Sequence, residues 1–137
     1  MLMKVEKLKE GGYLFPFEKL QVWQLAKELS IAIYNISKKF PANEQYGLTS
    51  QINRAAISVA SNLAEGSSRT SQKDYAYFSQ LAYSSLMEVT CQLSIAQGLG
   101  FVDKEEYAEI RQHIEGLSRK INALHRSQKE RATGDKG

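Results

Sequence analysis

Apolar residues recur every three or four positions along four segments of the chain, which is the spacing of helices that bury one face. The expected helices cover about 17–39, 47–65, 71 to either Gly98 or Gly100, and 103 onward. The last has the clearest apolar stripe, with charged residues on its other sides: Tyr107, Ile110, Ile114, Leu117, Ile121 and Leu124. No segment shows the strict alternation of apolar and polar residues that is typical of a strand. The pattern therefore predicts an all-α protein.

Residues that favour helix ends lie between these segments. Pro41 follows the first helix and cannot continue it. Gly66 is expected to end the second helix in a left-handed conformation. Ser71 and Asp103 each precede a helix and can accept a hydrogen bond from its first turn, so we expect them to be N-caps.

The connections between the expected helices are short, at 40–46, 66–70 and 99–102. Connections of this length place consecutive helices side by side and antiparallel. We therefore expect one domain, an antiparallel up-down-up-down four-helix bundle over 17–130. It is expected to follow an N-terminal extension, 1–16, and to precede a flexible C-terminal tail, 131–137, with fraying from Ser127 onward.

Charge is distributed very unevenly along the chain. The only charged residue in 75–102 is Glu88, and the only one in 48–64 is Arg54. A charged side chain costs several kcal/mol when it is buried without a partner, but little when it stays in water. Helices with a water-exposed face therefore normally carry charges on it. These two helices are therefore expected to be covered by further copies of the chain in a homo-oligomer.

The composition is that of an ordinary folded domain, since 42% of the 137 residues are hydrophobic and 24% are charged. The first twelve residues lack the apolar core of a signal peptide. Serines and glutamines interrupt the charge-poor stretch 75–102, which argues against a membrane-spanning helix. The lone Cys91 is interpreted as a small core residue in a reducing compartment. We expect a cytoplasmic protein with no membrane contact.

No pattern of residues indicates catalysis. The chain has no nucleotide-binding glycine loop, nucleophile elbow or cysteine cluster. His113 and His125 lie twelve positions apart, which is not a metal-ligand spacing. We therefore expect no catalytic residue, no metal and no cofactor, and interpret the protein as a non-enzyme.

Four polar residues of the second and third helices are expected to form a structural network: Arg54, Asn62, Glu65 and Glu88. Arg54 and Glu65 are too far apart on one helix to pair, so each is expected to be buried against a partner on another helix or subunit. Glu88 is the nearest acid for Arg54. An alternative is that Glu65 and Glu88 form a carboxylate pair for acid–base work or metal binding, but no histidine accompanies them.

The chain is mildly basic, with 18 Lys and Arg against 15 Asp and Glu and a formal charge of +3. The largest group of basic residues lies toward the C-terminus: Arg119, Lys120, Arg126, Lys129 and Arg131. An oligomer would repeat this group and so multiply a weak attraction for phosphates. We interpret the five as candidate nucleic-acid contacts, the alternative being a solvated surface. Three aromatic residues of the third helix are interpreted as core: Tyr75, Tyr77 and Phe78.

Several motifs occur together: Leu-Gln-Val-Trp at 20–23, Tyr-Gly-Leu-Thr-Ser-Gln-Ile-Asn-Arg-Ala-Ala at 46–56, Asn-Leu-Ala-Glu-Gly at 62–66 and Ser-Leu-Met-Glu at 85–88. With them the chain resembles, over about 17–124, the four-helix bundle proteins encoded in 23S rRNA intervening sequences of bacteria. The resemblance implies a bacterial cytoplasmic protein that assembles as a ring-like homopentamer. The architecture is also similar to that of the accessory protein of diversity-generating retroelements, which partners a reverse transcriptase and binds nucleic acid.

Two functions follow as expectations. The first is an oligomeric module that binds RNA or DNA through phosphate contacts, with an affinity that falls as salt rises. The second is a structural adaptor ring that binds a protein partner through an apolar or shape-matched surface and makes no nucleic-acid contact.

Overall fold

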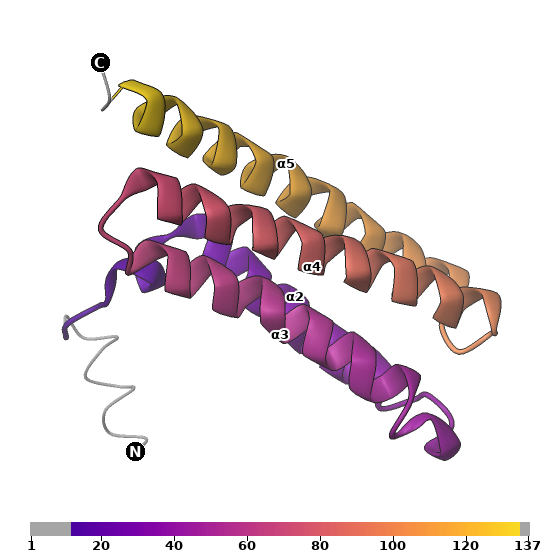
Figure 1. Cartoon of the computed structure of the whole chain (residues 1–137). Helices are drawn as coiled ribbons and strands as arrows, with labels where there is room; N and C mark the ends of the chain where they lie inside the picture. The colour runs from indigo at the N-terminus through magenta and orange to yellow at the C-terminus, as the bar shows by residue number, and fades with distance from the viewer. Residues whose placement is uncertain (1–11, 135–137) are drawn as a thin grey trace.

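The computed structural model describes residues 12–134 and contains four α-helices there: α2 (Gln21–Ser37), α3 (Leu48–Ser67), α4 (Gln72–Gly98) and α5 (Lys104–Gly134). Two short 3-10 helices, η1 (Pro16–Lys19) and η2 (Ala42–Glu44), precede α2 and α3. No strand occurs in this part of the chain. The helices form an antiparallel up-down-up-down bundle (Figure 1), so the predicted fold class is confirmed.

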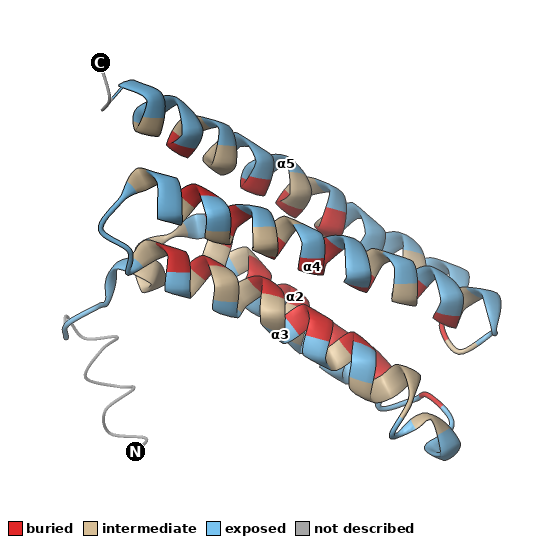
Figure 2. Ribbon diagram, in the orientation of Figure 1, coloured by how far each residue is buried: buried red, intermediate tan, exposed pale blue. Residues whose placement is uncertain are grey.

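The core lies along the inner faces of all four helices (Figure 2). Helix α3 packs between α2 and α4, and α5 packs mainly on α4 and to a smaller extent on α2. Leu29, Ile52, Leu86 and Ile121, one from each helix, are completely buried. The stripe predicted for the last helix is confirmed at its centre, where Ile110, Ile114, Leu117 and Ile121 are all buried.

Both predicted N-caps are confirmed. The Ser71 hydroxyl oxygen accepts a hydrogen bond from the Asp74 amide at 3.1 Å. The Asp103 carboxylate accepts one from the Glu106 amide at 2.8 Å. These bonds fix where α4 and α5 begin, because they satisfy amides that have no partner within the helix.

The prediction for Gly66 is wrong. Helix α3 continues to Ser67, and Gly66 is buried inside its last turn with an ordinary helical backbone. A Cβ atom there would lie 2.9 Å from Phe78 Cβ, so glycine is needed for the close approach of α4. The left-handed glycine is instead Gly100, with φ of 80°. It ends α4 in a Schellman motif, in which the Phe101 amide bonds to the Ala96 carbonyl at 2.9 Å and the Gly100 amide to the Gln97 carbonyl at 3.0 Å.

Helix α5 is longer than the sequence pattern indicated. It runs to Gly134, past the expected end of the bundle at 130, and the fraying expected from Ser127 does not occur within the described residues. Gln128 explains the extension, because it is completely buried and accepts a hydrogen bond from Ser79 of α4 at 2.7 Å. Residues 135–137 of the expected tail, and 1–11 of the expected N-terminal extension, lie outside the described part.

Two residues interpreted as core are exposed. Cys91 and Tyr77 both lie on the outer face of α4, and 58% of Tyr77 is accessible to solvent. Both interpretations are wrong because they rest on the absence of charge in α4. A helix face without charged residues need not be buried within the single chain. Within 12–134 no helix has the length and apolar character needed to cross a membrane.

Candidate nucleic-acid interface

The two halves of α5 carry opposite charge. From Lys104 to Glu115 the helix has four acidic and two basic residues, whereas from Gly116 to Gly134 it has five basic residues and one acid, Glu130. All five predicted contact residues are exposed: Arg119, Lys120, Arg126, Lys129 and Arg131. The structure thus leaves them accessible at one end of the bundle.

These five side chains do not form a single row. With 3.6 residues per turn, Arg119, Arg126 and Lys129 fall within an arc of about 80° on α5. Lys120 and Arg131 lie on the opposite flank, where Lys120 Nζ donates a 3.4 Å hydrogen bond to Gln21 of α2. Basic charge therefore wraps around the outside of this half of the helix.

None of the five forms an ion pair with another described residue. The ion pairs within 12–134 join Lys39 to Glu106, Arg69 to Glu65 and Arg111 to Glu115. The hydrogen bond to Glu106 raises the pKa of Lys39 above its usual value and joins the acidic half of α5 to the segment that follows α2. None of these three ion pairs involves a residue of the basic half of α5.

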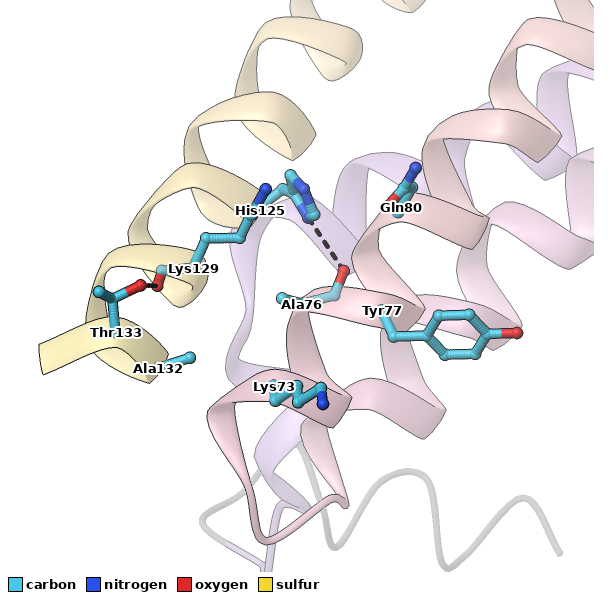
Figure 3. Close-up of a pocket in the computed structure, with 8 residues that line it drawn as sticks. All are labelled: Lys73, Ala76, Tyr77, Gln80, His125, Lys129, Ala132 and Thr133. Atoms are coloured by element: carbon cyan, nitrogen blue, oxygen red, sulfur yellow. Dashed lines mark hydrogen bonds between the residues drawn. The ribbon is translucent and has the colours of Figure 1, made fainter. Parts of the chain in front are cut away.

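A pocket of about 280 Å³ lies between the first turns of α4 and the last turns of α5 (Figure 3). Two lysines, Lys73 of α4 and Lys129 of α5, line it from opposite helices. Its other lining residues are Ala76, Tyr77, Gln80, His125, Ala132 and Thr133. His125 bonds through Nδ1 to the Ala76 carbonyl oxygen at 2.9 Å, so its Nε2 atom is available to bond to another group.

Sequence reasoning missed this pocket, because spacing along one helix cannot show which turns of two antiparallel helices lie opposite one another. A usable signal was present. A short connection at 99–102 folds α5 back along α4, so the C-terminal turns of α5 must approach the N-terminal turns of α4. Burial also raises the pKa of Tyr75 in this region, with the nearby charge of Arg131 opposing the shift.

The expected polar network does not form within the single chain. Arg54, Glu65 and Glu88 are exposed, and no ion pair joins any two of them. Arg54 and Glu88 do line one pocket of about 480 Å³ between α3 and α4, together with Gln51, Ala55, Ser58 and Gln92. Burial of these charges would require a second subunit over this pocket.

The other two members of the network have local partners. Asn62 donates hydrogen bonds to the carbonyl and hydroxyl oxygens of Ser58, at 2.8 and 3.0 Å. Ser58 in turn meets Ser85 of α4 at 2.8 Å. Glu65 lies beside Arg69 at 3.9 Å and lines a different pocket from Glu88. The two carboxylates are therefore not brought together as an acid–base pair.

Both histidines are bonded to main-chain carbonyl groups of neighbouring helices. His113 Nε2 lies 2.9 Å from the Leu25 oxygen of α2, and His125 binds α4 as described above. Among residues 12–134, no three His, Cys, Asp or Glu side chains gather in a way that could hold a metal ion.

This chain is similar to known proteins in both sequence and fold. Residues 18–123 match the model of the family described as 23S rRNA-intervening sequence protein. A crystal structure of a protein of unknown function from the S23 ribosomal protein family of Bacteroides thetaiotaomicron is similar in fold, with a TM-score of 0.69 and 22% sequence identity. The similarity covers 76% of this chain and 97% of that one. None of the curated proteins matches the chain.

Proposed function

The chain belongs to the 23S rRNA-intervening sequence protein family, and we propose that it is a non-enzymatic homopentamer that binds RNA or DNA through phosphate contacts. The observation that carries the nucleic-acid part is the basic half of α5, where five exposed cations have no acidic partner among the described residues. Unpaired surface cations attract phosphates and release their counterions on binding. Five copies of this surface would add weak contacts into useful affinity.

The oligomer is supported by the outer surface of α3 and α4. Large apolar side chains are exposed on both helices, Ile57 on α3 and Met87 and Ile95 on α4, and Arg54 and Glu88 are the only charges of the stretches 48–64 and 75–102. Large apolar side chains exposed on charge-poor helices favour a covering partner, and a second copy of the chain would supply one. The subunit contact that we propose places the pocket between α3 and α4 against the next chain.

The nucleic-acid contacts are proposed to be independent of base sequence, because no helix among residues 12–134 carries the set of polar side chains that reads base edges in a groove. The test is the salt dependence of an electrophoretic shift with structured RNA and with duplex DNA. We expect binding that weakens steeply with salt. Replacing Arg126, Lys129 and Arg131 together by Gln should reduce the slope of log affinity against log salt by about 2 to 3.

A control removes two cations from the other end of the bundle, by Lys38→Gln with Lys104→Gln. Both residues are exposed, and Lys104 lies roughly 40 Å from Arg131 along α5. For this control, we expect the slope of log affinity against log salt to equal that of the parent, because neither lysine belongs to the proposed contact surface. Parent protein that binds neither nucleic acid at low salt would contradict the proposed function.

The adaptor function has one observation of its own. A groove of about 340 Å³ between α2 and α3 is lined mainly by apolar side chains, among them Trp23, Ile31, Ile57 and Ala64. If the triple variant leaves binding unchanged, or if binding is absent at low salt, the groove becomes the better candidate, with a protein partner held by salt-insensitive contacts.

A further inference from the structure

Tyr77 is an exposed aromatic residue at the edge of the pocket between α4 and α5, about 16 Å along α4 from Glu88, so the subunit contact proposed around Glu88 leaves it accessible. Its ring meets Phe78 at a centroid distance of 5.6 Å and an interplanar angle of 77°, yet 58% of the residue remains accessible. Figure 3 shows the ring extending from α4 away from α5, at the outer edge of the pocket. An exposed ring held by a neighbouring aromatic residue is a surface on which a planar group can stack.

Cations lie on both walls of the same pocket. Lys73 comes from the first turn of α4 and Lys129 from the last turns of α5, and neither forms an ion pair with a described residue. Because the pocket lies between two helices, a phosphate placed there would meet positive charge from both sides. A single exposed lysine on an isolated helix offers no such arrangement.

Polar groups complete the lining. The Ala76 carbonyl can only accept a hydrogen bond, so His125 Nδ1 donates to it and the ring is held with Nε2 free to bond elsewhere. Gln80 contributes an amide one turn further along α4. These groups can bond to a sugar or base without requiring a particular base.

We propose that this pocket holds one nucleotide of a single-stranded nucleic acid, with the phosphate between Lys73 and Lys129 and the base stacked on Tyr77. The inference rests on the proposed function and specifies its ligand as single-stranded. The volume of about 280 Å³ suits one nucleotide unit, and a base paired inside a duplex is not free to reach the Tyr77 ring.

The test compares fluorescence anisotropy of labelled oligouridylate, oligothymidylate and a duplex of equal length. Tyr77→Ala should weaken binding of both single strands about tenfold and leave the salt slope unchanged, because stacking releases no counterions. Tyr77→Phe keeps the ring and should bind like the parent. Lys73→Gln with Lys129→Gln should lower the slope by about 1.

Tyr46→Ala is the matched control, because Tyr46 is 92% exposed and lies in the connection before α3, at the other end of the bundle. It should bind like the parent. If the parent binds both single strands but Tyr77→Ala does so equally well, the pocket inference is wrong and the proposed function stands. Equal losses for single strands and duplex would also overturn it, whereas a parent that binds nothing contradicts the proposed function itself.

A second measurement uses the parent protein, so its outcome does not depend on how Tyr77→Ala affects assembly. Oligouridylate containing 4-thiouridine is cross-linked by light and the modified peptide is identified by mass spectrometry. We expect the adduct on the α4 peptide that contains Tyr77. Adducts found only elsewhere would overturn the inference.

Discussion

Gly66 sets the distance between α3 and α4 at the end of the bundle that holds the candidate interface. An added Cβ would lie 2.9 Å from Phe78 Cβ and 3.2 Å from Tyr75 Cδ1. Gly66→Ala should therefore lower the free energy of unfolding by about 1 to 3 kcal/mol, since overpacking outweighs the better helix propensity of alanine. Chemical denaturation measures the change.

Gly116→Ala is the control for this prediction. Gly116 lies inside α5, and a Cβ there meets no atom within 4 Å. This variant should gain about 0.5 to 1 kcal/mol from helix propensity alone. If both alanine variants were stabilised alike, the close packing assigned to Gly66 would be wrong.

The sequence predicted the structural roles of some residues correctly and of others wrongly. Ser71 and Asp103 were predictable because a cap depends on the next three residues of the chain. Gly66, Cys91 and Tyr77 were not, because their roles depend on which neighbour another helix presents. The exposed state of the last two follows from their angle on α4, which charge content alone does not reveal.

Among the elements, α5 is bonded to each of its two neighbours through a histidine, His113 to α2 and His125 to α4, and the two rings use different nitrogen atoms. The carbonyl groups of Leu25 and Ala76 can only accept, so His113 must carry its hydrogen on Nε2 and His125 on Nδ1. Long-range ¹H–¹⁵N NMR of the neutral rings should show these two different tautomers. His113→Gln serves to assign the signals, and finding one tautomer in both rings would contradict the packing of α5.

The sequence predicted the existence and order of all four helices because each has a long apolar stripe. Helix ends were less predictable. The end of α5 was placed too early, because the burial of Gln128 against Ser79 comes from another helix and Gln128 itself is polar. The five basic residues could be found from sequence, whereas the position of Lys129 across the pocket from Lys73 needed the register of α4 against α5.

For the whole molecule, the proposed subunit contact predicts that Arg54 and Glu88 become buried and paired on assembly. Both are exposed in the single chain and line one pocket. Glu88→Ala should weaken assembly by about 3 kcal/mol, because it leaves a buried charge unpaired. Light scattering over a dilution series measures the loss.

Glu109→Ala provides the control, since Glu109 is an exposed acid of α5 away from that surface. The double variant with Arg54→Ala should lose less than the two single variants together, as expected for residues that interact. Assembly of Glu88→Ala that matches the parent at every concentration would show that the contact lies elsewhere.

The central claim is that several copies of this chain bind nucleic acid together. Native mass spectrometry of the parent protein mixed with a structured RNA at low ionic strength tests it most directly. We expect a species with the mass of five 15.4 kDa chains and at least one RNA attached. Single chains, or an oligomer that carries no RNA, would contradict the claim.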